Sequence, residues 1–379
     1  MSRHTFFAGV LAAFVGFASS FAVVLKGLSA MGASPAQAAS GLMALSVAMG
    51  MCAIGLSLWR REPISIAWST PGAALLASSA VPEGGFPAAV GAFLVCGGLI
   101  VLAGSWRPLG RAVAAIPSSL ANAMLAGVLL NLCLAPMRAV AALPLLALPI
   151  ILIWAVVWRF ARLYALPAAV AATIALLAAQ GSGGQTVEWL AGPVLVMPVW
   201  STAAAIGLGL PLFLVTMASQ NIPGMAVLSV NGYRPPSGPL FQATGLFTLL
   251  AVPFGGHAVN LAAITAALCA GPDAHPDPSR RYWAAVSAGA TYIVFGVLAG
   301  AATGLIAVSP PLLIEAIAGL ALLGALGGAL MGAVREAEER EAALITFLVT
   351  ASGLSFFGIS GAFWGLLAGG AMRALARWR

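Results

Sequence analysis

Charged side chains are scarce in this chain of 379 residues. Asp, Glu, Lys and Arg make up only 7% of it, whereas 61% of the residues are hydrophobic and the mean hydropathy is +1.03. Soluble domains carry about 25% charged residues, so this composition indicates a polytopic membrane protein. The net charge of +7 does not indicate nucleic-acid binding, because the basic residues stand singly or in pairs between apolar runs.

Metal-binding and catalytic motifs are also missing from the sequence. The four cysteines, Cys52, Cys96, Cys133 and Cys269, lie in apolar segments without a CxxC pair or a histidine at ligand spacing, so we expect no metal site. The chain has no HExxH sequence and no Asp-rich diphosphate motif, and its glutamates at 336–341 form a solvated connector with Arg335 and Arg340. These absences argue against an enzyme, and nothing predicts a cofactor. A passive channel stays open as an alternative that transport measurements must separate.

The apolar runs are long enough for about fourteen membrane spans of about 20 residues each, with only short connectors between them. The first seven spans are predicted at 6–28, 36–59, 64–80, 86–104, 112–134, 139–158 and 163–180. The second seven are predicted at 203–229, 238–253, 254–271, 282–306, 311–333, 341–354 and 356–373. The predicted fold class is therefore an all-α polytopic membrane protein.

The basic residues predict how these spans are oriented. With a cytoplasmic N-terminus, fifteen of the 17 Lys and Arg residues fall on the cytoplasmic side, and only Lys26 and Arg138 fall on the other. This positive-inside bias predicts that both termini are cytoplasmic. The first apolar run and Ala36-Gln37-Ala38 resemble a signal peptide with its cleavage site. We expect no cleavage, because the run is long and an internal repeat requires it.

That repeat relates the two sets of seven spans. Ala18-Ser19-Ser20 in the first span matches Ala218-Ser219-Gln220 in the eighth, and the 68–75 stretch of the third span matches 254–261 of the tenth. Ala126-Gly127 in the fifth span matches Ala318-Gly319 in the twelfth, and the offsets lie between 186 and 200 residues. Because seven is an odd number, the second copy enters from the opposite face, which makes the repeat inverted.

The tenth span is interrupted where a spanning helix should be continuous. Pro253, Gly255 and Gly256 disfavour a helix interior, so we expect an extended segment and then a half-helix that begins near His257 or Ala258. Non-helical backbone at membrane depth is tolerated only where protein buries it or where it lines a wet cavity. The positive end of the half-helix would then face that cavity and attract an anion.

The third span carries a similar break. Thr70 is suited to cap a half-helix, and Pro71 to occupy its first turn, followed by Gly72. An inverted repeat places this break and the break of the tenth span head to head near the midplane. Carboxylates are nearly absent from the spans, with Glu315 as the only candidate, and this scarcity favours an anionic ligand.

Polar residues beside the breaks are the candidate ligand contacts. His257 and Asn260 stand one turn apart at the predicted half-helix start, so both side chains would face one cavity. Two interpretations of His257 stay open, a helix-start residue satisfied by a backbone carbonyl or a ligand-facing, protonatable group. The eighth span holds a dense polar cluster, in which packing explains Ser219 better than it explains Gln220 and Asn221.

Two of these segments resemble the benzoate/proton symporter (BenE) family of bacterial inner-membrane transporters. The resemblance rests on the 219–224 sequence SQNIPG and the 253–261 sequence PFGGHAVNL, and the length, span count and Thr70-Pro71-Gly72 break agree over essentially the whole chain. It implies proton-coupled uptake of benzoate or a similar aromatic acid across a bacterial inner membrane. It also implies the fold shared by uracil/xanthine permeases and sulfate permeases.

In that fold, a core domain of spans 1 to 4 and 8 to 11 moves against a gate domain of spans 5 to 7 and 12 to 14. The resemblance therefore assigns residues 1–106 and 200–307 to the core domain, and residues 107–199 and 308–379 to the gate domain. The implied partners are the aromatic carboxylate, a proton and the lipid bilayer. A homodimer is possible.

The resemblance also implies a site between the two half-helix ends. Nucleobase permeases typically have a glutamate where this chain has Gln220, which disfavours a nucleobase and removes the obvious proton carrier. A same-fold transporter of a nucleobase or a small inorganic anion remains the alternative. His257 is the candidate proton site. Phe21 and Trp68 are further candidates to pack against the ring of the aromatic carboxylate. The candidate substrate-binding residues are Gln220, Asn260, Thr70, Ser219, Asn221, Pro71, Gly72, Gly255, Gly256, His257, Ala258, Phe17 and Phe254.

Overall fold

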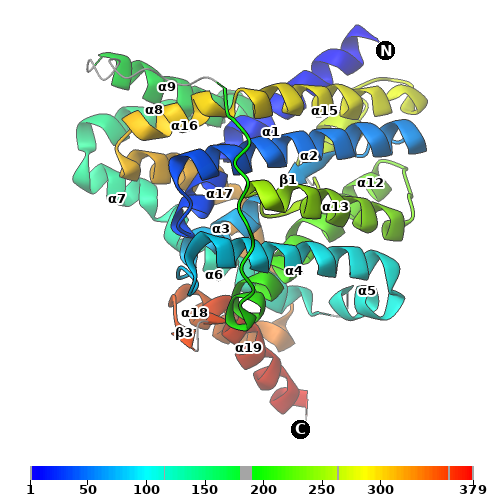
Figure 1. The fold of residues 1–379 in the computed structure, drawn as a ribbon, viewed down its shortest axis with the longest axis vertical. Helices are drawn as coiled ribbons and strands as arrows, with labels where there is room; N and C mark the ends of the chain where they lie inside the picture. The colour runs from blue at the N-terminus through cyan, green and yellow to red at the C-terminus, as the bar shows by residue number, and fades with distance from the viewer. Residues whose placement is uncertain (1, 115, 180–189, 263, 357–358, 378–379) are drawn as a thin grey trace.

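The computed structural model describes residues 2–114, 116–179, 190–262, 264–356 and 359–377, and most of them are helical (Figure 1). Among these residues, eight helical segments are long and apolar enough to cross a membrane. They are Arg3–Ala30, Pro35–Arg60, Gly85–Ser105, Ser118–Ala142, Arg162–Ala179, Thr202–Val230, Ser237–Phe254 and Pro311–Ala333. Residues 115, 180, 263, 357 and 358 of the predicted spans lie outside the described residues.

The described elements of the first half follow the predicted order. They are α1 (Arg3–Ala30), α2 (Pro35–Arg60), β1 (Ile66–Trp68), α3 (Thr70–Ser78), α4 (Gly85–Ser105), α5 (Arg107–Ala114), α6 (Ser118–Cys133), α7 (Ala135–Ala142), α8 (Pro144–Phe160), η1 (Arg162–Tyr164) and α9 (Ala165–Ala179). The predicted break of the third span is present, because three extended residues precede the short helix α3.

The second half contains a comparable series. It comprises α10 (Thr202–Ala204), η3 (Ala205–Gly209), α11 (Leu210–Thr216), η4 (Met217–Asn221), α12 (Ile222–Val230), α13 (Ser237–Ala251), η5 (Val252–Phe254), β2 (Val259–Leu261), α14 (Ile264–Ala270), η6 (Pro278–Arg280), α15 (Tyr282–Val297), α16 (Ala299–Val308), α17 (Pro311–Ala333), η7 (Ala337–Glu339), α18 (Arg340–Ala351), β3 (Ser355–Phe356), β4 (Ile359–Ser360) and α19 (Gly361–Arg377). The tenth span is thus also broken, into β2 and α14.

Helices that are distant in the sequence pack side by side. The helix α15 lies against α1 and α2, and α13 lies against α4 (Figure 1). Glycines allow this close approach, because a Cβ atom on Gly50 would come within 2.5 Å of the Gly289 carbonyl oxygen. At the other crossing, a Cβ on Gly245 would come within 3.0 Å of the Gly97 carbonyl oxygen. Small residues at helix crossings are the usual means by which membrane helices associate.

The two broken spans meet through their extended segments. The strands β1 and β2 are antiparallel, with Ile66 opposite Leu261, Ala67 opposite Asn260 and Trp68 opposite Val259. The pairing continues beyond both ends, since the Ser69 N–H donates to the Ala258 carbonyl at 3.0 Å and the Ala262 N–H donates to the Ser65 carbonyl at 2.9 Å. Each extended segment therefore supplies the hydrogen-bond partners that the other needs in an apolar interior.

The predicted start of the second half-helix is wrong. The chain turns at Gly255, whose φ is +88°, and remains non-helical through Ala258 before β2 begins. The helix α14 begins only at Ile264, so His257 and Asn260 do not stand one turn apart on a helix. Local propensity favoured a helix after the glycines, but pairing with the distant strand β1 imposes an extended backbone instead.

The repeat offset assigned to the broken spans needs the same correction. The strand β2 begins 193 residues after β1, and α14 begins 194 residues after α3. The sequence match had set Trp68 against Phe254, an offset of 186 residues. An aromatic residue followed by small residues occurs in both spans, but η5 and the turn at Gly255 occupy that position in the tenth.

Substitutions of two glycines in α2 test the helix crossing. We expect Gly50→Ala to lower the thermal midpoint of the detergent-solubilised protein, because overpacking costs about 1–3 kcal/mol. The control is Gly55→Ala on the same helix, where an added Cβ meets no atom within 4 Å. Alanine is also the better helix former, so the control should be neutral or slightly stabilising. Equal midpoints for the two variants would contradict the close approach of α2 and α15.

Candidate functional site

The N-terminus of α3 is capped by Ser69, so the prediction that Thr70 is the cap is wrong. The Ser69 side chain accepts a hydrogen bond from the Gly72 N–H at 3.1 Å, and the Thr216 hydroxyl donates to Ser69 Oγ at 2.9 Å. Ser69 retains the extended backbone that a cap requires, whereas Thr70 already occupies the first helical position. The Thr70 side chain makes no hydrogen bond with the described residues and is available to a ligand.

A cavity of about 60 Å³ lies beside the strand pair. Its walls come from α1, α2, β1, the start of α3, η4, α14 and α15, so both broken spans contribute to it. None of its lining residues is charged. The lining residues are Val15, Gly16, Ser19, Ser20, Met49, Ala67, Trp68, Thr70, Gln220, Ala262, Thr265 and Tyr292.

Gln220 reaches this cavity from a turn of π-helix. The segment η4 runs from Met217 to Asn221, and the wider turn interrupts the α-helical span between α11 and α12. Single π-helical turns occur frequently at functional sites. The Gln220 amide makes no hydrogen bond with the described residues, so it can donate to a ligand in the cavity. The residue pattern gave no signal for the π turn.

Asn221 holds the second strand in place. Its Oδ1 accepts a hydrogen bond from the Leu261 N–H at 2.9 Å, and its Nδ2 lies 3.1 Å from the Met217 sulfur. Asn260 donates from Nδ2 to the Leu261 carbonyl at 2.8 Å, and its buried Oδ1 has no hydrogen-bond partner. Neither asparagine is among the residues that line the cavity.

His257 is fully buried behind the strand pair and also lies outside the cavity lining. Its Nδ1 accepts a hydrogen bond from the Ala258 N–H at 2.7 Å, and Phe93 packs edge-on against the ring with centroids 6.4 Å apart. The Nε2 atom has no well-formed hydrogen bond, although the Ser69 backbone lies close to the ring. The histidine therefore contacts the residue that caps α3.

Several other predicted site residues shape the breaks. A Cβ on Gly255 would come within 3.2 Å of the Gln37 carbonyl oxygen, and one on Gly256 within 2.9 Å of the Ala251 Cβ. The Phe254 carbonyl accepts a hydrogen bond from Ser40 at 2.9 Å. In α3, Pro71 occupies the first turn, and a Cβ on Gly72 would come within 2.6 Å of Leu212.

Two other predicted residues, Phe17 and Ser219, do not line this cavity. The Phe17 ring packs against Trp68 with centroids 5.4 Å apart, which supports the wall of the cavity from behind. The Ser219 hydroxyl donates to the Val215 carbonyl at 2.5 Å within its own helical segment. Ser219 instead lines a separate cavity of about 150 Å³ between η4 and α6.

Four hydroxyl-bearing residues of the cavity lining were absent from the predicted site, namely Ser19, Ser20, Thr265 and Tyr292. The Ser20 hydroxyl accepts a hydrogen bond from Trp68 Nε1 at 2.8 Å and orients the indole ring. Ser19 and Ser20 both donate to the Gly16 carbonyl. The repeat match had singled out the two serines, but single polar residues in apolar spans, such as Thr265 and Tyr292, carry no pattern that reveals a site.

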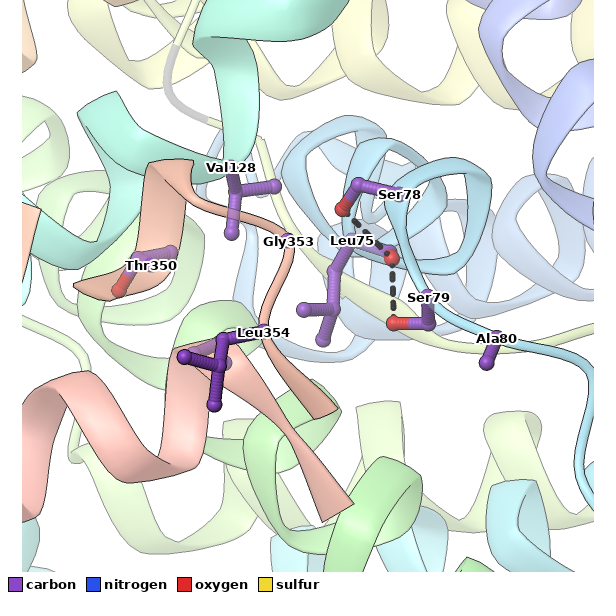
Figure 2. A pocket seen from close by; sticks show the side chains of 10 residues that line it. Leu75, Ser78, Ser79, Ala80, Val128, Thr350, Gly353 and Leu354 are labelled. Atoms are coloured by element: carbon purple, nitrogen blue, oxygen red, sulfur yellow. Dashed lines mark hydrogen bonds between the residues drawn. The ribbon is translucent and has the colours of Figure 1, made fainter. Parts of the chain in front are cut away.

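Two further cavities lie at other junctions. A small cavity of about 20 Å³ lies where the end of α3 meets α6, α18 and the turn after α18 (Figure 2). There the Ser78 and Ser79 hydroxyls donate to the Leu75 carbonyl at 3.0 and 2.7 Å. A much wider hollow of about 750 Å³ lies between α4, α5, α12 and the start of α13, and Arg111 lines it.

The support that Asn221 gives to β2 can be tested directly. Asn221→Ala removes the acceptor of a buried N–H, which costs about 1–3 kcal/mol, so we expect a lower thermal midpoint. The control is Asn231→Ala, because Asn231 donates only to the Val227 carbonyl of its own helix end. Equal midpoints would show that the Leu261 N–H does not depend on Asn221.

The sequence of this chain is similar to those of known membrane proteins. The sequence model of the family described as "Benzoate membrane transport protein" (BenE) matches residues 1–375. The inner membrane protein YdcO of Escherichia coli (strain K12) is 44% identical over 369 residues, which is 97% of this chain and 94% of that protein. The benzoate membrane transport protein of Acinetobacter baylyi is 34% identical over 364 residues, which is 96% of this chain and 92% of that protein.

Two solved structures have a similar fold. The transmembrane domain of a cyanobacterium bicarbonate transporter, BicA, has a TM-score of 0.63 at 15% identity and covers 100% of this chain and 97% of its own. The structure of SLC26A9 has a TM-score of 0.61 at 12% identity and covers 98% of this chain and 65% of its own. At these identities the likeness concerns the fold alone. The family match and the two relatives show that this multi-pass membrane protein belongs to the BenE family of benzoate membrane transport proteins.

Proposed function

We propose that the chain is a secondary active transporter that moves benzoate or a similar aromatic carboxylate together with a proton by alternating access. The observation that carries the proposal is the uncharged cavity where both broken spans meet. A site between half-helices near the midplane is the arrangement by which many secondary transporters hold a substrate. The name of the Acinetobacter baylyi relative supports benzoate as the substrate.

The cavity offers neutral hydrogen-bond donors and an aromatic wall. Thr70 and the Gln220 amide donate to the carboxylate, and the first turn of α3 adds the positive end of its helix dipole. The benzene ring packs against Trp68, whose orientation Ser20 fixes. No acidic side chain lines the cavity, so no like charge repels the anion.

The packing of the helices supports a 7+7 inverted repeat of fourteen spans. The helices α2 and α15, in the second and eleventh spans, pack together, and so do α4 and α13, in the fourth and ninth. In the proposed repeat the second span is equivalent to the ninth, and the fourth span is equivalent to the eleventh. Exchanging the two copies therefore converts one of these pairs into the other. The contacts of α1 with α14 and of α11 with α3 are related in the same way. Any two-fold relation between the copies produces this exchange, and the odd number of proposed spans in each copy makes the relation inverted.

An ion pair joins the core and gate domains of the proposal. The Lys26 ammonium on α1 pairs with the Glu315 carboxylate on α17 at 2.5 Å, and both side chains are partly exposed. In the proposed orientation this contact lies near the outer surface, with both termini in the cytoplasm of a bacterium. The wide hollow near α5 then lies on the cytoplasmic side.

Proton coupling requires a group whose protonation favours the bound anion. His257 is the proposed carrier, because its ring lies close to the backbone of Ser69, whose side chain caps α3, and Thr70 follows directly. A buried charge is costly without a partner, and the carboxylate supplies the opposite charge. Proton and anion therefore favour each other's binding, which is the reciprocal coupling that symport needs.

The first test of this function is uptake of radiolabelled benzoate into proteoliposomes. We expect Gln220→Ala to reduce uptake at least tenfold, because removing a donor to a charged group costs about 1.5–3 kcal/mol. The control is Gln242→Ala, since the Gln242 side chain on α13 makes only an exposed hydrogen bond, to Ser105 at the end of α4. If unlabelled uracil or bicarbonate reduced this uptake and unlabelled aromatic acids did not, the substrate would instead be a nucleobase or a small inorganic anion.

The second test concerns the proton. With an inward-directed pH gradient, we expect His257→Gln to bind benzoate but to lose gradient-driven accumulation, because glutamine accepts a hydrogen bond without titrating. The matched control is His275→Gln, since His275 lies on the connector before α15. Full gradient-driven accumulation by His257→Gln would remove this histidine as the proton carrier.

A further inference from the structure

One end of the cavity carries two hydroxyl groups that the proposed carboxylate contacts leave unused. Thr265 on α14 is only 6% exposed, and Tyr292 on α15 is only 3% exposed. Both side chains line the cavity. Their hydroxyls lie close to each other, but Thr265 Oγ1 has no well-formed hydrogen bond. Because buried hydroxyls are normally satisfied, this group indicates a partner that the cavity contents supply.

The helix α1 shows how this end relates to the carboxylate end. At Gly16 the helix has no side chain, and the Tyr292 hydroxyl fills the space that a Cβ would occupy. One turn later, Ser20 bonds Trp68, which stands two residues before Thr70. Tyr292 and Thr265 therefore meet α1 at Gly16, and Trp68 meets it at Ser20, one helical turn of about 5.4 Å further along.

The rest of the lining is mostly apolar or aromatic, and the Ser19 hydroxyl is bonded within its own helix. Val15, Met49 and Ala262 line the cavity together with the Trp68 ring, and the centroids of the Trp68 and Tyr292 rings are 6.5 Å apart. The cavity therefore combines the free donors of Thr70 and Gln220, an apolar and aromatic lining, and the hydroxyls of Thr265 and Tyr292. This set of environments suits an aromatic acid that carries a polar ring substituent as well as its carboxylate.

We infer that Thr265 and Tyr292 form a subsite for a ring hydroxyl, so that the preferred ligands are hydroxylated benzoates such as 4-hydroxybenzoate. This inference rests on the proposed function. A ring hydroxyl donates one hydrogen bond and accepts another, and each of the two side chains can provide the complementary group. A methyl substituent leaves Thr265 buried and unsatisfied, and a second carboxylate meets no cation there.

The inference is tested by equilibrium binding to the purified full-length protein in nanodiscs, with benzoate, 4-hydroxybenzoate and 4-methylbenzoate as ligands. We expect 4-hydroxybenzoate to bind more tightly than 4-methylbenzoate by on the order of tenfold, as one hydrogen bond predicts. It should also bind more tightly than benzoate. Wild-type protein that binds 4-hydroxybenzoate no more tightly than benzoate would overturn the subsite without any variant.

Two substitutions then locate the preference. In Thr265→Val, and separately in Tyr292→Phe, the ratio of the two dissociation constants for 4-methylbenzoate and 4-hydroxybenzoate should fall towards one. The control is Thr173→Val, because the Thr173 hydroxyl is buried in α9 and donates to the Ala169 carbonyl. It should keep the wild-type ratio. Thermal midpoints show whether each variant is folded. If one of Thr265→Val and Tyr292→Phe does not fold, the ratio of dissociation constants is measured in the other.

The outcomes separate this inference from the proposed function. If the wild-type protein binds benzoate but the ratio is unchanged in the folded variants, the subsite is wrong and the proposed function stands. If the wild-type protein binds none of the three acids, both fail. A ratio that falls in Thr265→Val and stays constant in Thr173→Val supports the subsite.

Discussion

The structure depends on one backbone pairing in the middle of an apolar bundle. Unpaired N–H and C=O groups are too costly at membrane depth, so a helix can be interrupted there only if another segment takes up its hydrogen bonds. The strands β1 and β2 satisfy each other, from Ser65 with Ala262 to Ser69 with Ala258. This mutual support allows two half-helices to begin inside the bundle. The cavity lies beside the strand pair, where these half-helices begin.

The polar side chains around the pairing divide into two groups. Asn221 and Thr248 bond the β2 backbone, where Thr248 Oγ1 accepts from the Val259 N–H at 2.9 Å and Asn221 accepts from the Leu261 N–H. These groups fix the strand and have little capacity left for a ligand. Thr70 and Gln220 bond no described residue and face the cavity. Asn221 and Thr248 thus hold the strand while a few free donors face the cavity, and groups presented by held elements orient a ligand more precisely than mobile ones.

The sequence was informative where local chemistry decides the structure. Pro253 and the glycines after it predicted the break in the tenth span, and Pro71 predicted the one in the third. The start of α14 was misplaced because β2 is extended through its pairing with a strand 193 residues away, which no local pattern reveals. The same limit applies to Asn260 and His257, whose expected approach to the ligand assumed a helix. The π turn at Gln220 and the convergence of Thr265 with Tyr292 depend on tertiary packing alone.

The most direct test of the account is the position of a heavy-atom ligand. A crystal structure of the full-length chain with 3-bromobenzoate, phased at the bromine absorption edge, locates the ring without assumptions about side-chain roles. The account predicts one anomalous peak inside the cavity beside Trp68, with the carboxylate directed at Thr70 and Gln220. A peak in the hollow near Arg111, with the cavity beside the strand pair free of ligand, would contradict it.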